Sequence, residues 1–110
     1  MAKKLILIRH GMLEPEYSGR FVGRIDAGLS SAGRRQAEAL ARCLDRLEPG
    51  SIIASPLRRA RETADIAMKT RDQSCLFDDG LCEIDFGDWE KKTFDEIKAA
   101  DPENAARWGR

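Results

Sequence analysis

The sequence contains a single histidine, His10, which lies between an arginine and a glycine at the end of the apolar run Lys4–Arg9. A neutral imidazole is a good nucleophile near pH 7, and its nitrogen can accept a phosphoryl group as a covalent intermediate. This transfer needs cations around the phosphate oxygens, because its catalysis consists mostly of positioning and charge stabilisation. Arg9 is adjacent, and Gly11 permits the turn that a shared site requires. The tripeptide therefore indicates phosphoryl transfer, with a structural histidine as the alternative.

Three arginines, Arg58, Arg59 and Arg61, follow the dipeptide Ser55-Pro56 at the expected start of a helix. Cations stabilise the opposite end of a helix, whereas the N-terminus favours anions. The cluster is therefore unfavourable for the helix alone, and a bound phosphate would compensate for it. The guanidinium fork can grip two phosphate oxygens at once. We expect one or two of these side chains to face a site, and we interpret Arg58 and Arg61 as part of a solvated basic face.

The segment Leu81–Glu90 supplies carboxyl groups that could donate a proton to a departing alkoxide. Glu83 has apolar neighbours in the sequence, so we expect partly apolar surroundings for it. Desolvation and a neighbouring phosphate would both raise the pKa of such a carboxyl, which suits a general acid. Asp85, Asp88 and Glu90 are rival candidates that composition alone does not separate.

The apolar pattern predicts strands and helices in alternation. Expected buried strands are Lys4–Arg9, Ser51–Ala54 and Ser74–Phe77, with Leu81–Ile84 continuing the third. A long loop, residues 11–29, precedes a helix that Ser30 or Ser31 caps, that buries Ala37, Leu40, Leu44 and Leu47, and that Pro49-Gly50 ends. Further helices are expected from the Ser55-Pro56 cap to about Thr70, from the Thr93-x-x-Glu96 capping box to about Ala100, and after Asp101-Pro102. This alternation predicts an α/β fold with crossover connections and a mostly parallel sheet.

Polar clusters follow each of the expected strands. They are the Arg9–Gly11 tripeptide, the segment Ser55–Arg61, and Glu83. Ligands of open α/β sheets bind beyond the carboxyl ends of the strands. We therefore expect a histidine, one or more arginines and a carboxylate to meet at one edge of the sheet.

Composition excludes several other classes of protein. The 110 residues suit one domain with one modest core, and no apolar run is long enough to span a bilayer or to form a secretory signal. Nineteen basic residues balance nineteen acidic ones, and the more basic part, residues 1–71, holds few aromatic residues, which argues against nucleic-acid binding. The three cysteines form no close pair and there is one histidine, so we expect no zinc site and reduced thiols in the cytoplasm.

Four motifs, in order, resemble the histidine phosphatase superfamily, the phosphoglycerate mutase-like proteins. They are L-I-R-H-G at Leu7–Gly11, G-R-F-x-G-x-x-D-x-x-L-S-x-x-G-x-x-Q-A at Gly19–Ala37, S-P-L-x-R-A-x-x-T-A at Ser55–Ala64, and L-x-E-x-x-F-G-x-W-E at Leu81–Glu90. The resemblance covers nearly the whole chain. It implies a three-layer αβα sandwich, and the G-x-W-E form is typical of the small phosphatase branch, which includes alpha-ribazole phosphatase.

The resemblance also implies a role for each matching residue. His10 becomes the nucleophile that is transiently phosphorylated, and Glu83 becomes the proton donor. Arg9, Arg59 and the Val22-Gly23 backbone hold the phosphate. The implied activity is hydrolysis of a small phosphorylated metabolite without a metal or an organic cofactor, and the alternative activity is mutase-type phosphotransfer.

This sequence departs from the family pattern in its histidine count and its length. The family uses a second histidine beside the nucleophile, in a strand and closing helices that come after the last motif, and this chain has one histidine in total. We therefore expect residues 1–110 to be one incomplete domain, truncated at the C-terminus, whose gap is covered by a missing C-terminal segment or by a second copy of the chain. A noncatalytic phosphate-binding remnant is the remaining alternative. Met12, Glu16 and Lys91 also replace residues more usual in the family.

Overall fold

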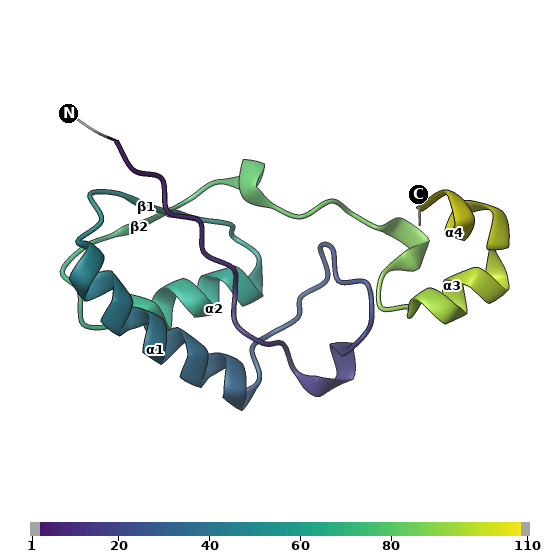
Figure 1. Ribbon diagram of the computed structural model, residues 1–110, viewed down its shortest axis with the longest axis horizontal. Helices are drawn as coiled ribbons and strands as arrows, with labels where there is room; N and C mark the ends of the chain where they lie inside the picture. The colour runs from purple at the N-terminus through teal and green to yellow at the C-terminus, as the bar shows by residue number, and fades with distance from the viewer. Residues whose placement is uncertain (1–2, 109–110) are drawn as a thin grey trace.

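The computed structural model describes residues 3–108 (Figure 1). Its strands are β1, Ile52–Ala54, and β2, Cys75–Phe77. Its helices are α1, Ser31–Leu47, α2, Arg58–Ala67, α3, Phe94–Ala100, and α4, Pro102–Trp108, with single 3₁₀ turns at Pro15–Tyr17, Asp79–Leu81 and Gly87–Trp89. No helix among the described residues is long and apolar enough to cross a bilayer.

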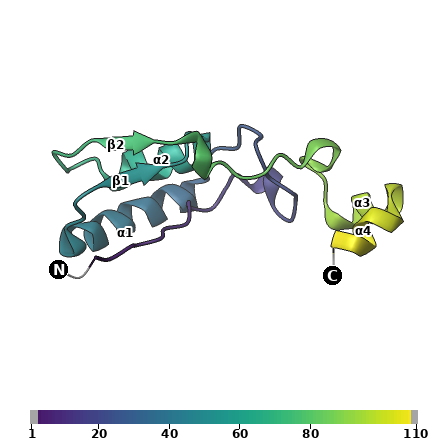
Figure 2. The ribbon, with the colours of Figure 1, turned by 90° about the horizontal axis from the view of Figure 1, so that it is seen from above.

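The two strands pair in parallel through the crossover helix α2. Ile52 lies opposite Cys75 and Ala54 lies opposite Phe77 in this register. Helices α1 and α2 pack side by side beneath one face of the strands (Figures 1 and 2). The α/β class with parallel pairing is thus confirmed, and its crossover unit follows the expected order.

Helix α1 is the element that local sequence predicts best. The Ser30 hydroxyl accepts a hydrogen bond from Gly33 N at 3.1 Å, which satisfies one of the free N–H groups of the first turn. Ala37 and Leu44 are buried on the predicted apolar stripe, whereas Leu47 at its end is half exposed. Glu48 ends the helix with a left-handed backbone, φ 48°.

Helix α2 differs from its expected form at both ends. It begins at Arg58 and ends at Ala67, before Thr70, and its N-cap residue has no side-chain hydrogen bond. The Ser55 hydroxyl accepts from Leu57 N at 3.2 Å, so this serine closes a turn that precedes the helix. The residues of α2 that are buried are Arg59, Thr63 and Ala67. Their spacing of four places two polar side chains on the inner face of the helix.

The prediction of a buried strand at residues 4–9 is wrong. Leu5 and Leu7 are 84% and 85% exposed, and the segment pairs with no strand among the described residues. Figure 2 shows it apart from β1 and β2. A strand is buried only when neighbouring strands and helices cover its edges and faces, and these residues have no such partner strand in the described chain.

The prediction that Leu81–Ile84 continues the third strand is also wrong. Asp78 accepts from Gly80 N at 2.8 Å through its carboxylate, and this bond turns the chain into the 3₁₀ turn Asp79–Leu81. The strands themselves are half covered, since Ile53 and Leu76 remain 54% and 61% exposed.

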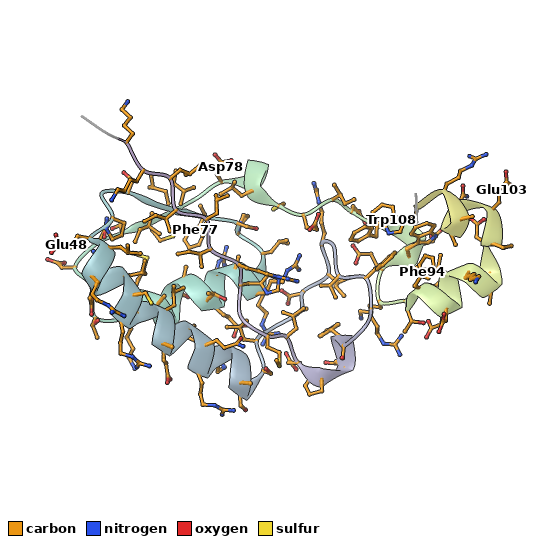
Figure 3. The ribbon with its side chains drawn as sticks, viewed as in Figure 1. Glu48, Phe77, Asp78, Phe94, Glu103 and Trp108 are labelled. Carbon is orange, nitrogen blue, oxygen red and sulfur yellow. The ribbon has the colours of Figure 1, made fainter. Side chains whose placement is uncertain are left out.

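The C-terminal helices form a separate packing unit with the long loop. Thr93 and Asp101 cap α3 and α4 as expected, accepting from Glu96 N at 3.1 Å and from Asn104 N at 3.3 Å. An aromatic cluster joins these helices to the loop, with ring centroids 5.1 to 5.9 Å apart, and its members are Phe21, Phe86, Trp89 and Trp108. Figure 3 shows Trp108 toward the opposite end of the molecule from Phe77 on β2.

The molecule is thin and elongated. Its radius of gyration is 16.5 Å and its dimensions are 49 × 34 × 20 Å, whereas a compact domain of this length would have a radius of about 13 Å. The face of the strands opposite α1 and α2 has no helix of the described chain over it (Figure 2). Apolar side chains on the strands and on residues 4–9 are left in contact with solvent for this reason.

Candidate active site

One open cavity of about 1440 Å³ brings the polar clusters together. Five of the residues that the sequence singled out line it, namely Arg9, His10, Val22, Arg59 and Glu83. Gly23 does not line the cavity, but its carbonyl oxygen accepts a hydrogen bond from Arg59. Residues of all three polar clusters thus line one cavity, although residues 4–9 are not a strand.

The hydrogen bond of His10 determines which ring nitrogen carries the proton. His10 Nδ1 lies 2.7 Å from the carbonyl oxygen of Gly11, and a carbonyl can only accept, so Nδ1 is the donor. In the neutral ring, Nε2 then keeps its lone pair. Burial lowers the pKa of His10, as do the nearby cations of Arg59 and Arg9, against the opposing effect of the Gly11 bond. The site therefore favours a neutral imidazole whose Nε2 carries no proton.

Two contacts fix the loop that carries His10. Gly11 N donates to the Thr63 hydroxyl at 3.1 Å, and this hydroxyl donates to Arg59 O at 2.7 Å, which ties the loop to α2. Gly11 also packs on the start of α1, where a Cβ on Gly11 would lie 2.6 Å from Gly33 O. Only glycine permits this approach of one backbone to another.

Arg59 is a buried cation with an unused donor. The residue is 5% exposed, and its Nη2 donates to Gly23 O at 2.6 Å and to Val22 O at 3.3 Å. Its Nη1 is buried and has no hydrogen-bond partner among residues 3–108. Burial lowers the pKa of Arg59, and the carboxylates of Glu83 and Glu90 oppose that effect. Because buried polar groups are almost always paired, the free Nη1 indicates a place for an anionic acceptor.

The four carboxylates have different surroundings. Glu83 lines the cavity, is exposed, and accepts from Ile84 N at 2.9 Å, so the apolar surroundings expected for it are absent. Asp85 accepts from Gly87 N at 2.8 Å, and Asp88 does not line the cavity. Glu90 does not line the cavity, and its carboxylate accepts hydrogen bonds from three backbone N–H groups.

Arg58 and Arg61 lie outside the cavity, as interpreted from the sequence. Arg58 is exposed and pairs with Glu62 at 3.1 Å, and the Arg61 guanidinium lies 5.2 Å from the centre of the Phe77 ring. Neither side chain reaches His10, because α2 turns only the Arg59 face inward. No group of histidine, cysteine and carboxylate side chains suited to a metal ion is found within residues 3–108.

Sequence reasoning missed two residues that support this site, Thr63 and Glu90. Thr63 follows Arg59 by four residues, and this spacing alone places both side chains on one face of a helix. The sequence offers Glu90 only as a rival acid, and nothing in its spacing indicates that it binds the loop around Gly23. That contact joins residues 67 positions apart.

The family model of the histidine phosphatase superfamily (branch 1) matches residues 5–110. The chain is 41% identical over 106 residues to the bifunctional protein Rv2228c of Mycobacterium tuberculosis, covering 96% of this chain and 29% of that protein. It is 38% identical over 107 residues to the glucosyl-3-phosphoglycerate phosphatase of Mycolicibacterium vanbaalenii, covering 96% and 47%.

Solved structures agree with the sequence relatives. The alpha-ribazole phosphatase from Shigella flexneri superimposes with a TM-score of 0.83 at 31% identity, covering 92% of this chain and 50% of that one. This chain therefore shares the fold of about half of that solved structure, and it spans half or less of the length of each of the three relatives. The motifs around His10 and Arg59, the matched family model and the shared fold together show that the chain belongs to the histidine phosphatase superfamily.

Proposed function

We propose that the protein hydrolyses a phosphomonoester of a small metabolite through a phosphorylated His10. The observation that carries this proposal is the buried Arg59, whose Nη1 lacks a partner among the described residues, in the same cavity as a histidine with a free Nε2. Phosphatase names among the relatives support the class of reaction.

In the first step, the His10 Nε2 lone pair attacks phosphorus and the ester P–O bond breaks. Arg59 and Arg9 hold the non-bridging oxygens, and Glu83 gives a proton to the departing alkoxide. In the second step, water attacks the phosphohistidine, the P–N bond breaks, and inorganic phosphate leaves. Glu83 takes up the proton of that water, so the enzyme returns to its starting state.

We propose that residues beyond this chain, or a second copy of it, complete the cavity. Leu5, Leu7, Ile53 and Leu76 leave an apolar strip in solvent, which a further strand and helices would cover. The same addition would supply the second histidine that the family places beside the nucleophile. Cys43, Cys75 and Cys82 are all free thiols, which supports the cytoplasm as the compartment.

The test is a rapid-quench experiment on the natural protein that contains this chain, with an aryl phosphate labelled on phosphorus. We expect label on the protein that is labile in acid and survives alkali, as a phosphorylated imidazole nitrogen does. His10→Ala should carry no label and should still bind inorganic phosphate. Arg59→Ala should weaken phosphate binding roughly 10²- to 10⁴-fold, because two charge-assisted hydrogen bonds of about 1.5–3 kcal/mol each are lost.

Three results would contradict the proposal. Unchanged phosphate affinity in Arg59→Ala would remove its basis. Equal turnover by the wild type and His10→Ala, with phosphate still bound, would favour the noncatalytic binding module. Transfer of the label to a second hydroxyl of a sugar acid, in place of release to water, would favour the mutase.

A further inference from the structure

The Glu90 carboxylate accepts hydrogen bonds from backbone donors of two segments of the chain. Its Oε2 accepts from Gly23 N at 2.9 Å, and its Oε1 accepts from Arg24 N at 2.8 Å and from Phe86 N at 3.3 Å. There is no room for a side chain at Gly23, since a Cβ there would meet the Ile84 carbonyl and the Glu90 carboxylate. A charged acceptor makes these bonds about twice as strong as neutral ones.

Further hydrogen bonds link the same backbone to the Arg59 guanidinium. Gly23 donates its N–H to Glu90 and accepts from Arg59 Nη2 at 2.6 Å through its carbonyl oxygen, so a single peptide segment joins the two charges. Val22, the preceding residue, accepts from the same Nη2 at 3.3 Å. The position of the 22–24 backbone therefore decides where Nη2 lies, and thus where the unpartnered Nη1 lies in relation to His10.

We propose that Glu90 is a positioning residue, which holds the 22–24 backbone so that Arg59 presents its free Nη1 to phosphate. This inference rests on the proposed function, in which Arg59 binds the phosphoryl group. Glu90 acts through the loop, because its own oxygens are occupied by backbone donors. Its negative charge, after that of Glu83, also opposes the effect of burial on the pKa of Arg59.

A double-mutant cycle in the natural protein tests this inference, with the dissociation constant of inorganic phosphate as the readout. We expect Glu90→Ala to weaken binding roughly tenfold to a hundredfold, the effect of misplacing a binding group by about 1 Å. Glu90→Gln keeps the size and two of the three acceptor contacts, so we expect a smaller loss. In the Arg59→Ala background neither substitution should weaken binding further, because the group that Glu90 positions is absent.

The matched control is Glu103→Ala. Glu103 is an exposed glutamate of α4 that pairs with Arg107 at 3.1 Å, and its removal should leave phosphate affinity unchanged. The inference would be overturned if the losses of phosphate affinity in the Glu90 variants were fully additive with the loss in Arg59→Ala. Wild-type phosphate affinity in both Glu90 variants would overturn it as well. If Glu90→Ala does not fold, the phosphate affinity of Glu90→Gln, alone and combined with Arg59→Ala, decides in the same way. Unchanged affinity in Arg59→Ala itself would refute the proposed function instead, so the two failures are distinguishable.

Discussion

Thr63 offers the sharpest test of how the fold positions His10. Its hydroxyl accepts from Gly11 N at 3.1 Å and donates to Arg59 O at 2.7 Å, and the residue is 6% exposed. Thr63→Val keeps the shape and removes the hydroxyl, which leaves the buried Gly11 N–H without an acceptor. Such an orphaned donor costs about 1–3 kcal/mol. The Arg59 carbonyl oxygen loses the hydrogen bond from the Thr63 hydroxyl, but it lies within α2, where the helix backbone supplies its other partner.

Thr63→Ser is the matched control, because it keeps the hydroxyl and loses one methyl group worth about 1 kcal/mol. Urea unfolding of the natural protein measures both effects. With a slope of ~2 kcal/mol/M, the valine variant should unfold at a urea concentration roughly 0.5–1.5 M below that of the wild type. Its kcat/KM should also fall about tenfold or more, since the His10 loop loses its tie to α2, whereas the serine variant should stay near wild type.

Two outcomes would refute this reasoning. A valine variant as stable as the wild type would show that the Gly11 N–H finds another acceptor. A serine variant whose kcat/KM falls as far as that of the valine variant would show that packing at Thr63, and not its hydroxyl, positions the loop.

Two further predictions concern pH and packing. Burial and the Arg59 cation lower the pKa of His10 from 6.5, so the acid limb of kcat/KM should lie below pH 6.5 and move to higher pH in the residual activity of Arg59→Ala. The free energy of unfolding should fall as pH drops through 6.5, because the unfolded imidazole takes up a proton there and the folded one does not. The same pH dependence of stability in wild type and in a His10→Ala control would contradict this. In urea unfolding, Gly33→Ala should lower the free energy of unfolding by about 1–3 kcal/mol, because the new Cβ meets the Met12 carbonyl. Gly50→Ala is the control: Gly50 has open space around it, so its free energy of unfolding should stay within about 0.5 kcal/mol of wild type.

Elements whose signals are local were predicted well from the sequence. The Ser30 cap and the apolar spacing of α1, and the Thr93 cap of α3, each depend on residues a few positions apart. The parallel pairing of β1 and β2 followed from the helix between them, which a crossover requires. The resemblance to a known family assigned roles to His10, Arg59 and Glu83, and the alternation of elements predicted that a histidine, several arginines and a carboxylate would lie at one edge of the sheet.

Features that depend on distant partners were not accessible from the sequence. The apolar run at residues 4–9 has the composition of a buried strand, but burial needs neighbours, and the described residues supply none on either edge. The long contact between Glu90 and the Gly23 backbone follows from how the loop folds back over the chain, which no local spacing encodes.

The three arginines of residues 58–61 show what the sequence determines and what depends on the tertiary structure. Composition and order determined that cations follow β1 and that a lone histidine precedes a glycine-rich loop. The tertiary structure decided that α2 begins at Arg58 and turns its Arg59–Thr63–Ala67 stripe inward. Neighbouring residues of a helix point about 100° apart, so the packing of that stripe buries one guanidinium beside His10 and leaves Arg58 and Arg61 in solvent.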